Sequence, residues 1–204
     1  RGRLQRQWIS PKGAGLYFSV VLRPRILQSS WPLITLAAAL AVHDALLEVY
    51  SLNTDIKWPN DILSNNRKLC GILAETVETA NGRALVLCIG INLTSSAFPP
   101  EVNEIATSVQ LETGEAPDLE IILRHLMIAL ERRYEMLQSV HGGEEVLREW
   151  SVRSSYASGK RVRVVSGQEV LEGTTRGLET DGALRVETAE GQIRIVRAGD
   201  VTGL

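Results

Sequence analysis

The amino-acid sequence predicts an α+β fold, in which a mixed or antiparallel sheet is backed by helices and followed by a small β-barrel. Apolar residues recur at helical spacing in 31–50 and again after Asp118, on either side of three strand-like runs. After residue 158, short segments alternate polar and apolar residues between glycine-containing turns, which is typical of a separate all-β unit. We therefore expect two domains, over residues 1–155 and 156–204.

The first two elements should be a strand and a buried helix. Residues 14–23 are rich in β-branched and aromatic types and end at Pro24, which predicts a strand. Residues 31–50 place leucines and alanines at helical spacing, which predicts a helix that packs closely on a sheet. His43 is expected on its surface as a hydrogen-bonded residue, because no residue of metal-ligand type lies three or four positions away.

Consecutive antiparallel strands should follow this helix. Ala80-Asn81-Gly82 is a turn signal between two apolar runs, which predicts a hairpin. The expected strands are 54–58, 67–77 and 83–93.

A long helix is expected after the hairpin. Asp118 is a suitable N-cap, the helix should run to about Val140, and Gly142-Gly143 should end it before a short helix over 144–150. The expected apolar face of the long helix consists of Ile121, Leu123, Leu126, Met127, Leu130, Tyr134 and Leu137.

The second domain should be a barrel of short strands, because closure removes exposed sheet edges. Its turns fall at 166–167, 180–182 and 190–191. The expected strands are 161–165, 169–173, 183–187 and 192–196.

Composition excludes several classes of protein. With 22 Lys+Arg against 24 Asp+Glu, bulk charge does not indicate binding to nucleic acid or to a membrane surface. The longest apolar stretch, residues 33–42, is shorter than the ~20 residues that a membrane span needs, and no signal peptide is visible. Cys70 and Cys88 lie in strand-like apolar runs, so core packing is favoured over disulfide or redox chemistry. We therefore expect a cytoplasmic protein.

The segment KWPND, residues 57–61, is the most informative stretch of the chain. Pro59 holds the residue before it in the extended region, so Lys57 and Trp58 should end a strand, while Asn60 and Asp61 should lie in a turn. This arrangement places a cation at a fixed position above a sheet. The alternative is an exposed lysine beside a proline turn, with Asn60 and Asp61 as turn formers.

Four segments together resemble the biotin protein ligase family in order and spacing. They are RGRLQRQW at 1–8, KWPND at 57–61, KLCGILAE at 68–75 and GINL at 90–93. The resemblance covers essentially the whole chain, although residues after 93 match in pattern only, and the C-terminal domain is similar to the SH3-like domain of these ligases. It implies a class II synthetase-like catalytic domain that is N-terminally incomplete here, because the family's upstream Ser-Thr-Asn segment is absent.

The resemblance implies a two-step, AMP-forming ligase reaction. Biotin and MgATP would give biotinyl-5′-adenylate, and a lysine of the biotin carboxyl carrier protein domain of acetyl-CoA carboxylase would then attack it. ATP, Mg²⁺ and biotin are the expected small molecules, while metal ligands in the protein are unknown. No membrane or nucleic-acid partner is expected from this part of the chain. We also expect a homodimer, paired through a strand at 16–23 or 83–93 if that strand lies at a sheet edge.

The basic segment at the start of the chain suits this chemistry. Charge that develops on the α-phosphate is stabilised by cations and backbone N–H groups, which arginine forks and a glycine-containing backbone supply. The alternative is a flexible basic terminus. The resemblance assigns Arg1 and Gly2 to biotin and Arg3, Arg6 and Trp8 to ATP or the adenylate, with Arg3 also retaining the intermediate.

Lys57 is the expected catalytic residue beside Arg3, because its ammonium group would contact both the biotin carboxylate and the α-phosphate. Lys68 is either part of the site or a charged residue that protects a strand edge. Glycines inside strands often mark the close approach of a ligand. The resemblance assigns Gly71, Gly90, Ile72 and Leu73 to the biotin pocket and Asn60 and Asn92 to the nucleotide; Trp8 and Trp58 would cover adenine or simply pack.

Two alternatives to a biotin ligase stay open. A lipoate ligase would share the fold and the adenylation chemistry, and a non-catalytic protein would use the C-terminal barrel for interaction. Gln5 and Cys88 stand where the family usually has glycine, which changes side-chain volume near the ligands. The missing upstream segment means either a longer polypeptide or weak biotin binding.

Overall fold

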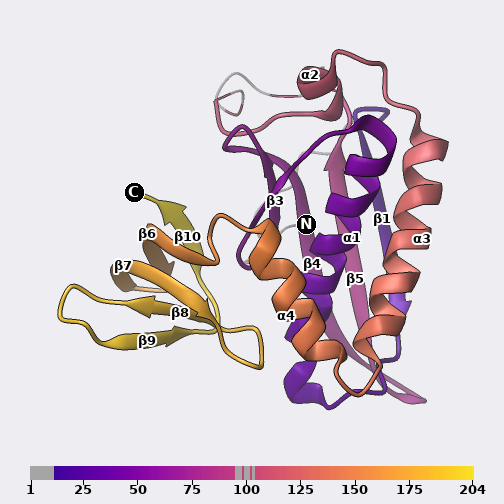
Figure 1. The fold of residues 1–204 in the computed structure, drawn as a ribbon. Helices are drawn as coiled ribbons and strands as arrows, with labels where there is room; N and C mark the ends of the chain where they lie inside the picture. Colours follow the sequence, from indigo (N-terminus) through magenta and orange to yellow (C-terminus); the bar gives the residue numbers. More distant parts are fainter. Residues whose placement is uncertain (1–11, 95–97, 99–101, 103) are drawn as a thin grey trace.

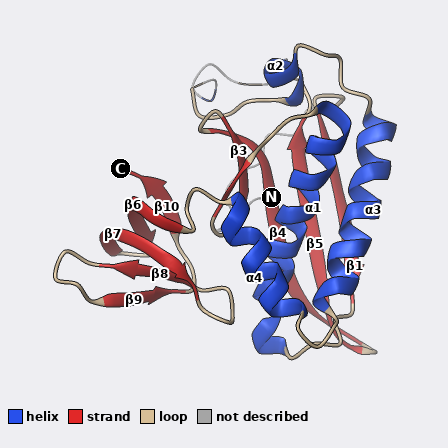
Figure 2. Cartoon of the chain, viewed as in Figure 1, coloured by secondary structure: helices blue, strands red, loops and turns tan. Residues whose placement is uncertain are grey.

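The computed structural model describes residues 12–94, 98, 102 and 104–204. Its larger part is a five-stranded sheet in the order β1-β5-β4-β3-β2, with helices α1, α3 and α4 on one face (Figures 1 and 2). Every ladder in this sheet is antiparallel, and one isolated parallel bridge joins Lys68 to Ala106. The strands are β1 (Gly15–Leu22), β2 (Asp55–Lys57), β3 (Asp61–Ser64), β4 (Arg67–Thr79) and β5 (Gly82–Asn92).

Helix α1 (Pro32–Tyr50) is the centre of the core. Pro32 occupies the first turn, where its missing N–H is not needed, and Ser51 ends the helix in the left-handed region with φ of 52°. The helix over 31–50 is confirmed. It is long and apolar enough to cross a membrane, but about two thirds of it is buried inside the protein, as in the core helix of a globular domain.

His43 is hydrogen-bonded as expected, but it lies inside this core, so the expected position on the helix surface is wrong. Its side chain is 4% exposed, and Nδ1 lies 2.9 Å from Thr54 Oγ1 and 3.1 Å from the Thr54 carbonyl oxygen. The error has a physical cause. Helix α1 is covered by the sheet on one side and by α3 and α4 on the other, so it has almost no solvent-exposed face.

Two further helices cover α1. Asp118 caps α3 (Leu119–Leu137) by accepting from the N–H groups of Glu120 and Ile121, as expected. The helix ends three residues earlier than about Val140, and Ile121 and Met127 are exposed rather than buried. Gly142 begins α4 (Gly142–Arg153) instead of only ending the previous helix.

The sheet confirms the predicted hairpin and adds one strand. The turn at 80–81 joins β4 and β5 in register. β3 was not expected, and Asp61 is its first residue rather than part of a turn. β5 pairs with both β1 and β4, so residues 83–93 do not form a sheet edge that could pair with a second subunit. Among the described strands, β1 (Gly15–Leu22) does lie at an edge.

A second five-stranded antiparallel sheet, in the order β10-β6-β7-β8-β9, forms the C-terminal part. Four of its strands correspond to the expected ones. β10 was missed because its sequence, DVTG, contains one large apolar residue, Val201, and so shows no polar and apolar alternation. Within the described residues no ladder joins β9 to β10, so this unit is an open, SH3-like barrel rather than a closed one. The strands are β6 (Ser158–Ser166), β7 (Glu169–Leu178), β8 (Leu184–Glu187), β9 (Ile193–Val196) and β10 (Asp200–Gly203).

Candidate functional site

One row of residues crosses all five strands of the larger sheet. Directly opposed residues of antiparallel strands carry their side chains on the same face, and the register links Lys57 to Asp61, Asp61 to Gly71, Gly71 to Gly90 and Gly90 to Tyr17. The row therefore places a lysine, a carboxylate, two glycines and a tyrosine on one face.

The neighbouring row has the opposite character and shows which face this is. Ile56, Ile62, Cys70, Ile91 and Leu16 are opposed in the same way, and all are buried in the core with α1. Successive residues of a strand point to opposite faces. The Lys57 row consequently lies on the face of the sheet away from the helices.

Lys57 is a half-buried cation at the end of β2. Burial holds its pKa below the ordinary value for lysine; Asp61 and Asp200 act against this effect, while Lys68 and Lys160 add to it. Asp200 and Lys160 belong to the C-terminal sheet. The electrostatic field at Lys57 thus comes from both parts of the protein.

Asp61 connects Lys57 to a second lysine. Lys68 Nζ donates to Asp61 Oδ1 over 2.6 Å, and both side chains are partly exposed. Lys68 thereby forms an ion pair beside Lys57, which agrees better with a site residue than with an isolated charge at a strand edge. Three charged groups then lie together at one end of the row.

Gly71 and Gly90 form the middle of the row, where neither residue adds a side chain to the surface of the sheet. We call the side of the sheet away from the helices the open face. Leu73 points to the same face, opposite Cys88, and Ser19 Oγ donates to Cys88 Sγ over 3.1 Å. Ile72 does not reach this surface: it is 1% exposed and packs on the helix side. The expectation that Ile72 and Leu73 contact one ligand is wrong for Ile72, because neighbours along a strand face opposite ways.

The two asparagines expected at the nucleotide hold the backbone together. Asn60 Nδ2 donates to the Ile72 carbonyl oxygen over 2.7 Å, and the Asn60 carbonyl oxygen accepts from Ile72 N. Asn92 is 7% exposed, and its Nδ2 donates to the carbonyl oxygens of Lys68 and Thr107. Both residues fix the edges of the site, whatever further contact they make.

Trp58 packs, which decides between its two expected roles. It is 2% exposed, and Nε1 donates to the Gly182 carbonyl oxygen of the C-terminal sheet over 2.9 Å. The segment after α4 also contacts β2, since Ser154 Oγ donates to the Ile56 carbonyl oxygen and Asp55 accepts from Ser155 N and Oγ. Sequence reasoning missed these contacts because serine and aspartate in a linker carry no specific signal.

The cysteines differ in burial. Cys70 is fully buried, and burial raises the pKa of its thiol, which makes the group unreactive. Cys88 is only half-buried, on the open face, so the expectation of core packing holds for Cys70 alone. Both are free thiols.

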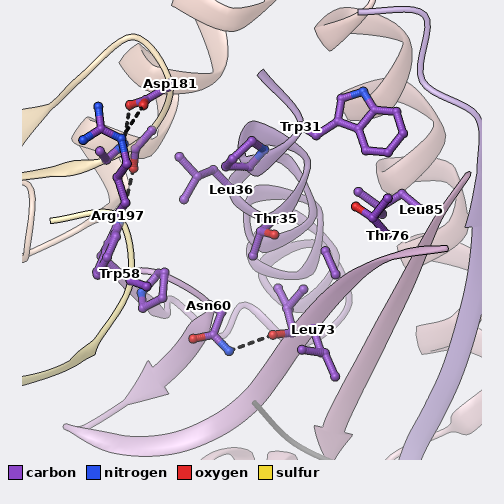
Figure 3. A pocket seen from close by; sticks show the side chains of 17 residues that line it. Trp31, Thr35, Leu36, Trp58, Asn60, Leu73, Thr76, Leu85, Asp181 and Arg197 are labelled. Atoms are coloured by element: carbon purple, nitrogen blue, oxygen red, sulfur yellow. Dashed lines mark hydrogen bonds and ion pairs between the residues drawn. The ribbon is translucent and has the colours of Figure 1, made fainter. Parts of the chain in front are cut away.

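A cavity of about 330 Å³ lies between the KWPND turn, the start of α1 and the C-terminal sheet (Figure 3). Its walls come from the start of α1, the turn after β2, β4 and the C-terminal sheet, including Trp31, Leu36, Trp58 and Ile72. The ion pair between Arg197 and Asp181 closes one side. No residue of the Lys57 row lines this cavity, although Leu73, which shares the face of that row, does.

Arg1, Gly2, Arg3, Arg6 and Trp8 lie outside the described residues, so their expected roles stay predictions. Among the residues that the structure describes, no group of three or more His, Cys, Asp or Glu side chains is arranged to hold a metal ion.

Comparison with known proteins gives the family. Residues 1–92 match the Biotin/lipoate A/B protein ligase family, and residues 157–202 match the Biotin protein ligase C terminal domain. The Biotin--[acetyl-CoA-carboxylase] ligase of Mycobacterium tuberculosis is 35% identical over 100% of this chain and 75% of its own length. That of Paracoccus denitrificans is 33% identical over 98% of this chain and 85% of its own length. The chain belongs to the biotin protein ligase family.

Other relatives and solved structures agree with this assignment. The Bifunctional ligase/repressor BirA of Bacillus subtilis is 38% identical over 97% of this chain, which spans 61% of that relative's length. The structure of the biotin protein ligase from Aquifex aeolicus in complex with biotin and ATP superposes with a TM-score of 0.85 at 27% identity, covering 100% of this chain and 84% of that one. The expected fold class is confirmed.

Proposed function

We propose that this chain carries the catalytic part of an ATP-dependent, AMP-forming biotin ligase. It would activate biotin to biotinyl-5′-adenylate and transfer biotin to a lysine of a biotin carboxyl carrier protein domain. The observation that carries the proposal is the Lys57-Asp61-Gly71-Gly90-Tyr17 row on the open face of the sheet. Support comes from the Aquifex aeolicus relative, which shares the fold and was solved with biotin and ATP.

Each part of the row suits one step of this reaction. The two glycines carry no side chain, so a flat, largely apolar ring system could lie against the backbone there, with Leu73 and Tyr17 at its sides. Lys57 then stands at the end of that surface, where the ligand's carboxylate would meet the α-phosphate. A cation between two anions reduces their repulsion and stabilises the charge that grows as the anhydride forms.

Lys57 and Asp61 have different expected effects on the reacting groups. The half-buried position of Lys57 strengthens its electrostatic interaction with an anion, since less water screens it. Asp61 and Lys68 fix each other's side chains at 2.6 Å and leave a net positive charge with Lys57. Magnesium would arrive with the phosphates of ATP, because the described residues form no metal cluster. Arg1, Gly2, Arg3, Arg6 and Trp8 are proposed to complete the site.

The test is adenylate formation by the purified chain. Biotin and MgATP should release pyrophosphate and yield biotinyl-5′-adenylate, and adding a carrier domain should give biotinylated carrier protein. Lipoate in place of biotin should give little product. Equal or better turnover with lipoate would favour the alternative ligase, and no turnover with either acid would favour a non-catalytic protein or a fragment that needs further sequence.

We further propose a cytoplasmic location and a homodimer that pairs through the edge strand β1. Free Cys70 and Cys88 agree with a reducing compartment. Among the described strands, β1 lies at an edge of its sheet, and its residue Val21 is 57% exposed. Sedimentation with and without biotinyl-adenylate tests the dimer; a monomer at every concentration in both conditions would rule it out.

A further inference from the structure

Glu112, in the short helix α2 (Val109–Thr113), is a buried carboxylate that four side chains surround. Its side chain is 2% exposed. Oε2 accepts from Ser64 Oγ over 2.7 Å and from Asn65 Nδ2 over 2.6 Å, and Oε1 accepts from Arg67 Nη2 over 2.7 Å and from Thr107 Oγ1. Burying a charge is costly unless it is paired and hydrogen-bonded, and this carboxylate is both.

The charge on Glu112 persists at neutral pH. Burial alone would raise the pKa of this carboxyl group, but the hydrogen bonds from Thr107, Ser64 and Asn65 and the charge of Arg67 lower it below the ordinary value for glutamate. Glu112 therefore acts as a fixed anion to which four donors from separate segments are attached.

Three of those donors lie at the tip of the β3–β4 hairpin. Ser64 ends β3, Asn65 stands in the turn, and Arg67 begins β4. Asn65 and Asn66 have φ of 49° and 62°, and the register of the hairpin shifts between Ile62 and Leu63. A bulge disrupts the ladder locally. The hydrogen bonds from Ser64, Asn65 and Arg67 to Glu112 add a second constraint at the tip of the hairpin.

The two legs of this hairpin carry the ion pair of the site. Asp61 is the first residue of β3, and Lys68 is the second residue of β4. The distance of 2.6 Å between their charged atoms requires that the legs keep their relative position. A shift of β3 relative to β4 at the tip of the hairpin would therefore change the distance between Asp61 and Lys68.

Thr107, the fourth donor to Glu112, also contacts the main chain of Lys68. Lys68 N donates to the Ile105 carbonyl oxygen over 2.8 Å, and Thr107 N donates to the Lys68 carbonyl oxygen over 2.9 Å. Glu112 holds the Thr107 hydroxyl, and Asn92 Nδ2 donates to the Thr107 carbonyl oxygen over 3.0 Å. The main chain of Lys68 is thus held between the hairpin and the segment 105–107, and Glu112 contacts both.

We propose that Glu112 is a positioning residue, which sets the Asp61–Lys68 pair beside Lys57 for adenylation. The inference rests on the proposed function of the open face. Among the described residues, the hydrogen bonds of the Glu112 carboxylate reach neither Lys57 nor Asp61; it would act on them only through the β3–β4 hairpin and Thr107. A carboxylate is required because two of its four partners, Arg67 and Asn65, present N–H groups; a glutamine would turn an NH₂ group toward one pair of donors and lose the charge that balances Arg67.

The experiment is a single-turnover measurement of biotinyl-adenylate on the full chain. Glu112→Gln is compared with wild type and with Glu115→Gln, whose exposed side chain lies three residues further along the chain. The amplitude of biotinyl-adenylate formation gives the fraction of protein molecules that have a competent site. The rate constant depends on how well the reacting groups are positioned in those sites. We expect Glu112→Gln to retain the amplitude per folded protein while the rate constant falls roughly ten- to a hundred-fold, with Glu115→Gln unchanged.

Thr107→Val provides a second variant that removes one donor and leaves the carboxylate. Its rate constant should fall by a smaller factor at full amplitude. A purely structural role would instead lower the amplitude, or the urea midpoint, at an unchanged rate constant, and that result would overturn the inference. If wild type forms no adenylate from biotin, the proposed function fails and the inference fails with it; a normal wild-type burst with an equally fast Glu112→Gln overturns the inference alone.

Discussion

Trp58 Nε1 donates a hydrogen bond of 2.9 Å to the carbonyl oxygen of Gly182, 124 residues further along the chain. The bond joins the residue next to Lys57 to the turn before β8 in the C-terminal sheet. Trp58 is 2% exposed, so this hydrogen bond is shielded from bulk solvent. The C-terminal sheet therefore supports the strand end that carries Lys57, and it is part of the architecture of the site.

Trp58→Phe should destabilise the protein by about 1–3 kcal/mol, because the buried Gly182 carbonyl oxygen loses its donor. Trp150→Phe is the matched control: Trp150 is also buried, but among the described residues its Nε1 has no hydrogen-bond partner. Urea unfolding measures both. A loss for Trp58→Phe no larger than that for Trp150→Phe would show that the hydrogen bond contributes nothing.

Gly71→Ala and Gly90→Ala should each weaken biotin binding at least ten-fold while leaving the fold intact. Neither glycine has a positive φ, so alanine fits the backbone and should change stability by only ~0.4–1 kcal/mol, in the stabilising direction unless it meets a neighbour. The added methyl groups would stand in the row between Lys57 and Tyr17, where the proposed ligand lies against the backbone. Titration calorimetry with biotin measures the affinity.

Gly82→Ala is the counterpart of these two variants. Gly82, in the β4–β5 turn, has φ of 87°, which alanine disfavours, and it lies at the far end of the hairpin from Gly71. The variant should lose stability but retain biotin affinity. Unchanged biotin affinity in Gly71→Ala and Gly90→Ala would remove the glycines from the proposed binding surface.

The sequence predicted the elements that have a long apolar periodicity or a turn signal, but it did not predict which side of the sheet each strand residue occupies. Helix 31–50 and the hairpin at 80–82 are confirmed because long apolar periodicity and a glycine turn are local signals. Alternation could not show on which side of β4 a ligand would lie. The register shows which residues share a face: it places Gly71 on the side away from the helices and Ile72 in the core.

The site was predictable in part for the same reason. KWPND carries its signal within five residues, so Lys57 was found at a strand end. The ion pair of Asp61 with Lys68 depends on β3, which follows directly on the proline turn and shows no polar and apolar alternation. Glu112 depends on three donors about 45 residues away in sequence. Tertiary contacts of that kind leave no local pattern.

Lys57→Met should abolish adenylation without loss of stability. Removing a cation from the developing charge costs roughly 3–4 kcal/mol in the barrier. Burial holds the pKa of Lys57 below 10.5, so the unfolded chain binds this proton more tightly than the folded protein does. The resulting penalty on folding is present at neutral pH, and it is relieved as the pH rises toward 10.5. Methionine removes that penalty, and Asp61 keeps Lys68 as its partner.

Pyrophosphate release and urea unfolding at pH 7 are the two measurements for this variant. Arg194→Met, at an exposed position of the C-terminal sheet, controls for loss of one positive charge and should leave both unchanged. A Lys57→Met enzyme that releases pyrophosphate within a few-fold of wild type would show that Lys57 is not catalytic.

His43 should make the protein sensitive to mild acid. Burial lowers the pKa of its imidazole, with Arg153 and Arg133 acting in the same direction and Asp44 and the Thr54 hydrogen bond against it. The stabilisation is fully present above 6.5, the value in the unfolded chain, and is lost as pH falls from 6.5 to the folded-state pKa, because only the unfolded chain then takes up the proton. The slope reaches about 1.4 kcal/mol per pH unit for one group.

His43→Gln should remove this part of the pH dependence, since glutamine can still hydrogen-bond toward Thr54 but does not titrate. The free energy of unfolding is measured at several pH values between 5 and 8, the range in which an imidazole gains its proton. His141→Gln serves as the control, because the side chain of His141 is 81% exposed, and the wild-type acid response should persist in it. If His43→Gln and wild type lose stability in parallel below pH 6.5, the acid response comes from another group and the buried imidazole has no part in it.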